Sequence, residues 1–286
     1  MKTQNTTEKE YLEISNLISE YLNQLNQTTS TNNLESSLSL FDIKSGSFRL
    51  GEFTVIAGRP AMGKTKLMTK LALDFATNSP VLFFNYSQNE YTLTNHFISS
   101  LLGINHYNNS QNVEQSKIEE EFKNREIFIN ENYGNSIYAL RNYCKQMINE
   151  KGVKVIFIDN LDDMTSGRFH ENREIEINVI AYELKNIAKD FNVCVIASTM
   201  VSRSVEEREN SKRPLLPDLK YSKGISLTAD KIISIYRDDY YGIQINENGE
   251  YTTGIMELIL QQNNNGNLGT FQYEYRNHSM YKPTSL

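Results

Sequence analysis

The sequence has few of the features that mark secreted, membrane-spanning or histone-like proteins. It contains two cysteines, Cys144 and Cys194, which lie far apart and form no CxxC pair, so a disulfide framework and a zinc ribbon are both disfavoured. No apolar run approaches the roughly 20 residues of a membrane helix. The opening residues MKTQNTTEKEY include no apolar signal-peptide core. These absences predict a cytoplasmic chain with no membrane partner.

An excess of basic residues is also missing. Lys and Arg total 29 against 35 Asp and Glu, a formal net charge of −6, which excludes a uniformly basic binder of nucleic acid. A local basic loop is compatible with this charge, because a phosphate contact needs only nearby Lys or Arg. The 286 residues, 39% of them hydrophobic and 22% charged, suit one large α/β domain or two small ones.

The N-terminal segment reads as a helix followed by a linker. Residues 8–26 place apolar side chains at the i, i+3, i+4, i+7 spacing of an amphipathic helix, and the polar stretch after them is typical of a linker. The apolar stripe packs either on its own domain or on a neighbouring subunit. We therefore predict a linker helix and flexible linker over 1–32 and one folded domain over 33–286.

The folded domain alternates short apolar runs with helical spacing. Strands are expected at 53–57, 81–84, 126–129, 153–158, 193–197 and 231–236, and helices at 64–76, 90–102, 136–150 and 172–191. Two last strands, 254–262 and 270–275, flank NNNGNLG and predict a closing β-hairpin. Alternating strands and helices predict an α/β fold with a mostly parallel twisted sheet covered by helices on both faces.

One motif carries nucleotide chemistry. Residues 58–65 fit G-x-x-x-x-G-K-[ST] between a predicted strand and a predicted helix, which is where a P-loop needs them. Its glycines let backbone N–H groups surround phosphates, while the lysine reaches the β and γ phosphates and the threonine hydroxyl binds Mg²⁺. The predicted cofactors are ATP and Mg²⁺. The residues expected to bind them are Gly58, Arg59, Pro60, Ala61, Met62, Gly63, Lys64, Thr65 and Lys66.

A second acidic position completes this site. Asp159 ends the strongest predicted strand, where a carboxylate can hold the metal through water beside Thr65. Taken alone, Asp159 is equally suited to cap the following loop. Combined with the P-loop, the metal role is favoured, so the predicted metal-binding pair is Thr65 and Asp159, with Lys64 and Asp159 as catalytic candidates.

These motifs resemble those of the C-terminal motor domain of DnaB-type replicative helicases, a RecA-like P-loop fold, from about residue 33 to 275. Residues 58–65 resemble the family's A-R-P-x-M-G-K-T, residues 158–161 its I-D-Y-L, and residues 203–208 match a later motif in order and spacing. The resemblance implies a hexameric ring around single-stranded DNA, with ATP between neighbouring subunits. It also implies that the linker helix docks on the adjacent subunit. We expect no N-terminal collar domain ahead of that helix.

The resemblance also assigns DNA contacts. The family's DNA loop aligns with residues 218–224, where Lys220 replaces an arginine and Lys223 adds a charge; Arg203 and Arg208 lie nearby in the sequence. These four residues are the predicted DNA-binding set. Six such loops lining one pore would hold phosphates despite the acidic net charge. A solvated surface loop is the alternative interpretation.

The chain departs from the family at its hydrolytic positions. Ser87 stands where the family has a catalytic glutamate, Met200 where it has a glutamine sensor, and Gln262 and Asn264 where it has a K-x-R motif. A serine lacks the carboxylate that general-base catalysis uses, and an arginine finger is worth roughly 10³ to 10⁵ in rate. Two nearby side chains are weak substitutes for the base: Gln88, which would orient water, and Glu90, which needs a local rearrangement.

The sequence therefore predicts a DnaB-like, ATP-binding, ring-forming motor domain that acts on single-stranded DNA in DNA replication, with weakened or altered hydrolysis. The alternative is a catalytically inactive helicase paralogue that binds ATP and regulates, loads or inhibits an active ring. A filament-forming recombination protein is a third class, which the family detail in the loops disfavours. The predicted partners are single-stranded DNA and copies of the chain or a homologous helicase.

Overall fold

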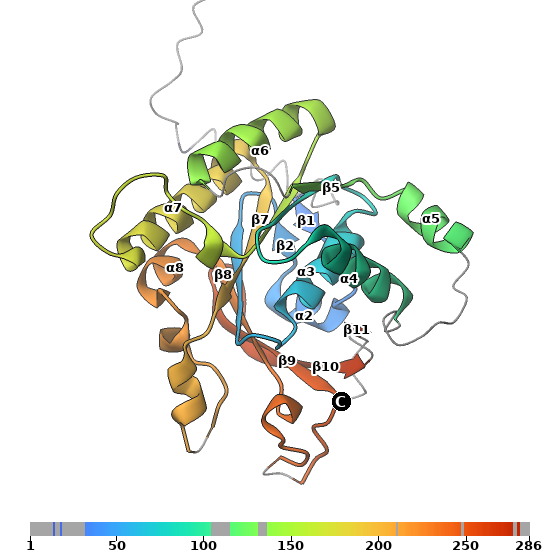
Figure 1. Ribbon diagram of the computed structural model, residues 1–286, viewed down its shortest axis with the longest axis vertical. Coiled ribbons are helices and arrows are strands. Elements are labelled where there is room, and N and C mark those ends of the chain that lie inside the picture. Colours follow the sequence, from blue (N-terminus) through green and yellow to red (C-terminus); the bar gives the residue numbers. More distant parts are fainter. Residues whose placement is uncertain are drawn as a thin grey trace, which may run out of the picture. The chain divides into compact units, whose positions relative to one another are not determined.

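The computed structural model describes residues 14, 18, 32–103, 115–130, 136–209, 211–246, 249–276 and 279–280. The chain divides into two compact units, residues 1–33 and 34–286. The predicted linker helix at 8–26 lies outside the described residues except for Ile14 and Ile18, which are helical, so the boundary at 32/33 stays a prediction. The second unit carries the sheet and the site (Figure 1).

A nine-stranded sheet forms the centre of the described part of this unit, in the order β11-β10-β9-β8-β3-β7-β6-β4-β5. The six strands from β8 to β5 pair in parallel, and β9, β10 and β11 add an antiparallel edge. The strands are β3 (Phe53–Gly58), β4 (Val81–Asn85), β5 (Ile127–Asn130), β6 (Val155–Asp159), β7 (Cys194–Met200), β8 (Lys231–Tyr236), β9 (Ile255–Asn263), β10 (Gly269–Arg276) and β11 (Ser279–Met280). The predicted mostly parallel α/β sheet with a closing hairpin is confirmed.

Helices cover both faces of the sheet (Figure 1). They are α2 (Ser39–Ser45), α3 (Lys64–Phe75), α4 (Glu90–Leu102), α5 (Gln115–Lys123), α6 (Ile137–Lys151), α7 (Arg173–Phe191) and α8 (Ser222–Thr228), with two further short strands, β1 (Asn33–Leu34) and β2 (Phe48–Arg49). The buried side chains of α3 and α4 belong to one hydrophobic cluster, and those of α6, α7 and α8 to another. Successive side chains of a strand point to opposite faces. Accordingly, Phe157 of β6 joins the first cluster and Ile158 the second. The central strands β3, β4, β6 and β8 are therefore buried along their whole length.

The helix boundaries follow local capping chemistry. The Asn89 side chain accepts a hydrogen bond from the Thr92 N–H at the start of α4, and Asn172 does the same for the Ile175 N–H at the start of α7. At the other end, α4 is followed by Gly103 in the left-handed region. These signals explain why α4 and α7 begin within one residue of their predicted starts.

Three short helices, α2, α5 and α8, were not predicted. The correction that matters most is α8, because its first turn falls within residues 218–224, which the sequence predicts to be a loop. This seven-residue helix packs on α7, where a Cβ at Gly224 would lie 1.7 Å from Asn178 Oδ1. Such a short helix depends on tertiary packing, and seven residues are too few to show a clear helical period.

Candidate functional site

The P-loop joins the end of β3 to the start of α3. Ala61 and Gly63 both have left-handed backbone angles, with φ of 62° and 108°. Alternating left- and right-handed residues turn successive N–H groups toward one concave side, which is the geometry of an anion nest. The φ of 108° favours glycine at position 63, and a Cβ there would also lie 2.6 Å from Met256 Cε of β9, so that this side-chain end would have to shift. The predicted loop is thus built between a buried strand and a helix N-terminus.

Two lysines bring positive charge to this loop. The Lys64 ammonium donates hydrogen bonds to the carbonyl oxygens of Gly58 (3.0 Å) and Arg59 (3.3 Å). Burial lowers the pKa of Lys64, and the nearby Asp159 and Asp162 carboxylates oppose that shift. Burial also lowers the pKa of Lys66, to about 8. Both ammonium groups therefore gain stability from any anion that binds the loop.

The predicted metal-binding pair is brought into contact. The Thr65 hydroxyl in the first turn of α3 donates to Asp159 Oδ2 at 2.5 Å, although the two residues are far apart in sequence. The other carboxylate oxygen, Asp159 Oδ1, accepts from the Ser198 hydroxyl of β7 at 2.6 Å. Asp159 is buried at the carboxyl end of β6. Ser198 is a site residue that the sequence interpretation missed.

The turn after β4 brings one of its polar side chains to this pair. Asn85 and Gln88 close the turn, since Asn85 Nδ2 donates to the Gln88 carbonyl (2.7 Å) and the Gln88 N–H to Asn85 Oδ1 (3.2 Å). The Gln88 side chain then donates to Thr65 Oγ1 at 3.4 Å. Ser87 and Glu90 are exposed. Of the two predicted substitutes for a base, Gln88 is thus the one that contacts the pocket.

Asp162 is a further buried acid that the sequence interpretation did not select. It lies in the short 3-10 helix Leu161–Asp163, and its Oδ2 accepts from the Thr199 hydroxyl and the Met200 N–H, both at 3.0 Å. Burial raises the pKa of Asp162, against the effects of Thr199 and Lys220. The signal was present in the sequence, because Asp162 lies three positions after Asp159, just beyond the end of the same strand.

The predicted DNA-binding residues lie in two neighbouring segments. Lys220 is about half exposed and Lys223, in the first turn of α8, is exposed. Arg203 is exposed at the start of the short 3-10 helix Arg203–Glu207. Arg208 differs from the other three, because its guanidinium forms an ion pair with Asp218 at the base of the loop. Three of the four predicted cations thus face solvent, while Arg208 braces the loop.

Comparison with known proteins decides the family. The family model for the DnaB-like helicase C-terminal domain matches residues 33–282. This chain belongs to the DnaB-like helicase C-terminal domain family. The resemblance inferred from the P-loop and the Asp159 motif is confirmed, and the chain is a member of the replicative helicase family with a P-loop ATPase fold.

Curated relatives agree with this assignment. A probable replicative DNA helicase of Trieres chinensis is 35% identical over 239 residues, which is 80% of this chain and 52% of the relative. The replicative DNA helicase DnaB of Geobacillus stearothermophilus is 31% identical over 248 residues, 82% of this chain and 52% of the relative. A probable plasmid replicative DNA helicase of Chlamydia psittaci is 32% identical over 228 residues, covering 76% and 48%. The chain spans about half the length of these relatives.

Solved structures show the same fold. One of them, an ATPase domain, superposes with a TM-score of 0.84 at 23% identity, covering 96% of this chain and all of that one. A DnaB-like replicative helicase, described with its interactions with primase, gives a TM-score of 0.81 at 24% identity, covering 95% of this chain and 69% of that one. In the described part of this DnaB-like domain, no helix has both the length and the apolar character to cross a membrane.

The two positions of the family's K-x-R motif lie at the far end of β9. Gln262 Nε2 donates to the carbonyl oxygens of Ser226 (3.0 Å) and Ala229 (2.7 Å) at the C-terminal end of α8. Asn264 is exposed, and its backbone N–H donates to the Asp230 carbonyl at 2.9 Å. Gln262 is therefore used inside the domain, where it caps the carbonyl end of a helix.

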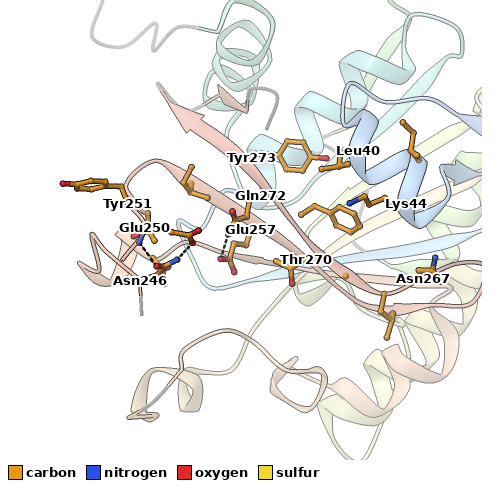
Figure 2. A pocket seen from close by; sticks show the side chains of 17 residues that line it. Leu40, Lys44, Asn246, Glu250, Tyr251, Glu257, Asn267, Thr270, Gln272 and Tyr273 are labelled. Carbon is orange, nitrogen blue, oxygen red and sulfur yellow. Dashed lines mark hydrogen bonds between the residues drawn. The ribbon is translucent and has the colours of Figure 1, made fainter. Parts of the chain in front are cut away.

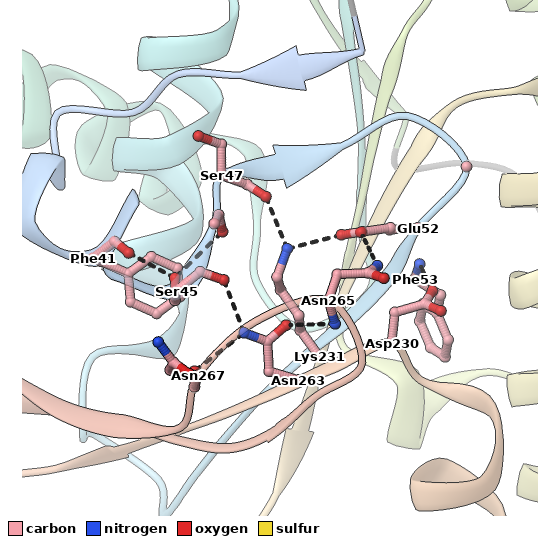
Figure 3. Close-up of polar contacts among 12 residues, drawn as sticks. Phe41, Ser45, Ser47, Glu52, Phe53, Asp230, Lys231, Asn263, Asn265 and Asn267 are labelled. Carbon is pink, nitrogen blue, oxygen red and sulfur yellow. Dashed lines mark hydrogen bonds and ion pairs between the residues drawn. The ribbon is translucent and has the colours of Figure 1, made fainter. Parts of the chain in front are cut away.

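Next to Gln262, the same strand end contributes to a closed polar cluster. Lys231 is 1% exposed and donates to Glu52 Oε2 and to the Ser47 carbonyl, both at 2.8 Å (Figure 3). Asn263 and Asn265 add hydrogen bonds to the Ser45 carbonyl (2.8 Å) and to Glu52 Oε1 (2.7 Å). The cluster lies at the amino ends of β3 and β8, so it is remote from the P-loop at the carboxyl ends.

A groove of about 1100 Å³ lies along β9 and β10 beside α2 (Figure 2). Its lining includes Leu40 and Lys44 of α2, Tyr273 of β10, and Glu250 and Tyr251 of the segment between β8 and β9. No P-loop residue lines it. The groove is thus separate from the nucleotide site.

Proposed function

We propose that this DnaB-like domain binds Mg·ATP in its P-loop and acts on single-stranded DNA in DNA replication. It does so as part of a ring made of its own copies or shared with a homologous helicase. The observation that carries the proposal is the 2.5 Å contact between Thr65 Oγ1 and Asp159 Oδ2, which joins the P-loop to the end of β6. Family membership supports the ring and the DNA.

The residues present fit a triphosphate and its metal. Thr65 and Asp159 offer hydroxyl and carboxylate oxygens, the ligand types that Mg²⁺ prefers. Among the residues that the structure describes, the hydrogen bonds of the Lys64 ammonium go to the Gly58 and Arg59 carbonyls, which phosphate oxygens would replace as stronger, charged acceptors. Bound Mg²⁺ would neutralise charge on the phosphates. The domain's own part is to orient them through the loop N–H groups, Lys64 and Lys66.

Hydrolysis in this pocket is proposed to be slow. Gln88 reaches the Thr65 hydroxyl, but an amide orients water and does not accept its proton at neutral pH. Met200 has no side-chain amide, and its backbone N–H donates to Asp162 Oδ2. Ser87 is exposed. The domain therefore retains the groups that bind nucleotide and lacks those that accelerate its cleavage.

The second candidate function is a regulator that binds ATP without turnover and modifies an active helicase ring. The hydrogen bonds of Gln262 favour it. A residue that is neutral and already bound to the Ser226 and Ala229 carbonyls brings no cation to a neighbour's nucleotide. In a mixed ring, such a subunit would bind ATP and leave the adjacent site without its finger.

Phosphate release separates the two functions. The pure chain is incubated with Mg·ATP, with and without single-stranded DNA, beside the Lys64→Ala variant as background. DNA-stimulated release that Lys64→Ala abolishes supports a motor. Micromolar nucleotide binding in calorimetry with release at the Lys64→Ala background supports the regulator. Failure to bind any nucleotide at millimolar concentration overturns both.

A further inference from the structure

A short backbone segment, residues 199–202, lies between the P-loop and the predicted DNA loop. That loop, residues 218–224, is called the basic loop below. On the P-loop side, the Val201 N–H donates to the Gly58 carbonyl at 3.3 Å, and Arg59 Nη1 donates to the Val201 carbonyl at 3.0 Å. The Gly58 carbonyl is also an acceptor for Lys64. The segment is thus hydrogen-bonded directly to the phosphate loop.

On its other side, the same segment holds the base of the basic loop. The Lys220 N–H donates to the Met200 carbonyl at 3.0 Å, and the Ser202 N–H donates to the Asp218 carbonyl at 2.8 Å. Val201 and Leu219 form an antiparallel bridge between these bonds. The backbone of Lys220 is therefore fixed by hydrogen bonds, and its side chain is the part that can reorient toward a different partner.

Two acids interact with the Lys220 side chain, Asp162 and Asp163, and Asp162 is the one that forms an ion pair with it. Its carboxylate is 6% exposed, and Lys220 Nζ lies 3.9 Å from Asp162 Oδ1. Asp162 Oδ2 is bound by Thr199 and Met200, whereas Oδ1 has no hydrogen-bond partner in the described part of the chain. A buried carboxylate with one oxygen unbonded attracts a nearby ammonium more strongly than an exposed one does.

We infer that Asp162 is a positioning residue that restrains Lys220 and so lowers the affinity of the basic loop for nucleic-acid phosphate. A phosphate of the strand must compete with the buried carboxylate, 3.9 Å from Nζ, for the charge of the same ammonium, so the carboxylate weakens the attraction of Lys220 for the phosphate. The inference rests on the proposed function, which assigns single-stranded DNA to this loop. It adds that the loop carries its own competing anion.

The alternative role for Asp162 is purely structural, since it also holds Thr199 and Met200. The two roles predict opposite signs. Loss of a structural brace would loosen the loop and weaken DNA binding, whereas loss of a competing anion strengthens it. Thr199→Val is the matched control, because it removes one hydrogen bond to Asp162 and leaves the carboxylate charge in place.

The test is a double-mutant cycle read by fluorescence anisotropy of a labelled oligothymidylate at fixed low salt. We expect Asp162→Asn to tighten binding about 2- to 5-fold, the range of a partly screened ion pair. Lys220→Ala weakens binding, and Asp162→Asn added to Lys220→Ala has no further effect. Thr199→Val does not tighten binding. Thermal melting checks each variant, and Asp162→Ser replaces Asp162→Asn if the amide prevents folding.

The outcomes divide cleanly. If Lys220→Ala weakens binding but neither neutral variant of Asp162 tightens it, the inference is wrong and the proposed DNA surface stands. Equal tightening with and without Lys220 also overturns it, because the effect would then be a general gain of positive charge. If Lys220→Ala binds DNA as the native chain does, the proposed DNA surface fails and the inference fails with it.

Discussion

Two clusters of buried polar side chains lie at opposite ends of the parallel sheet, and they differ in how completely their atoms are bound. At the amino ends, Lys231 is enclosed by Glu52 and the Ser47 carbonyl, and Lys185 pairs with Asp230 at 2.5 Å. At the carboxyl ends, Asp162 Oδ1 and Gln88 Oε1 are buried without hydrogen-bond partners in the described part of the chain. The Lys231 cluster is a closed network that stabilises the fold, whereas the unbonded oxygens of Asp162 and Gln88 are acceptors left open beside the P-loop.

The largest expected effect tests the closed end. Lys231→Met leaves Glu52 buried without its cation, so the free energy of unfolding should fall by about 3–5 kcal/mol. Nucleotide affinity should not change, because this pair lies at the opposite edge of the sheet. Urea unfolding and calorimetry measure the two quantities. The combined Lys231→Met and Glu52→Gln variant should recover part of the lost stability. If the double variant is no more stable than Lys231→Met alone, the loss does not come from an unpaired Glu52 charge.

The next effect tests the open end. Lys64→Ala should weaken binding of a non-hydrolysable ATP analogue by about 30-fold or more, since truncating one partner of a buried charge pair costs roughly 2–5 kcal/mol. Calorimetry gives the affinity. Thermal melting should show little loss of stability, in contrast to Lys231→Met. Unaltered affinity would mean that the loop does not hold phosphates in this domain.

Restoring a carboxylate at the turn after β4 should raise hydrolysis by less than these changes. Ser87→Glu is expected to increase phosphate release about 10- to 100-fold. This is at or below the lower end of the roughly 10²- to 10⁴-fold range of general acid–base catalysis, because Gln262 and Asn264 still supply no finger. Glu90→Gln is the matched control and should have no effect, since Glu90 is exposed. A loss of activity in Glu90→Gln would instead identify that residue as the base.

The smallest expected effect is a proton taken up on binding. Burial lowers the pKa of Lys66 to about 8, and bound phosphates should raise it again. At pH 8.5, binding should therefore draw up to about 0.7 proton onto Lys66. Calorimetry in two buffers of different ionisation enthalpy measures this uptake. Lys66→Met should reduce it, leaving only the share of Lys64, and an unchanged uptake would exclude Lys66.

The pH dependence of the stability of the nucleotide-free domain should also reflect Lys66. Because the folded pKa of Lys66 lies below its ordinary value of 10.5, the unfolded chain binds more protons between about pH 8 and pH 10.5. The contribution of Lys66 to the free energy of unfolding thus rises with pH through that window. Urea unfolding of Lys66→Met beside the native chain isolates this contribution.

Motifs with a fixed local geometry could be predicted from the sequence. The P-loop needs glycine at position 63 and a helix start at Lys64, and both signals lie within eight residues. The contact between Thr65 and Asp159 followed from two such motifs, because the carboxyl ends of parallel strands meet at one edge. The spacing of apolar residues was likewise enough to place α4 and α7.

Features that depend on distant packing were not predictable in the same way. The helix α8 depends on the fit of Gly224 against Asn178, which no local period reveals. Arg208 and Gln262 could each bind several different acceptors. In the folded chain Arg208 pairs with Asp218, and Gln262 donates to carbonyls at the end of α8. Only the folded chain decides which of these acceptors lies within reach.

Strand β9 contacts residues next to both the P-loop and the basic loop. Met256 of β9 lies against Gly63 behind the phosphate loop, and Gln262 of the same strand holds the last carbonyls of α8, the helix that carries Lys223. Six residues of extended chain span about 20 Å. The length of β9 therefore sets the distance between the two loops. A one-residue deletion inside β9 would alter that distance without changing the sequence of either loop.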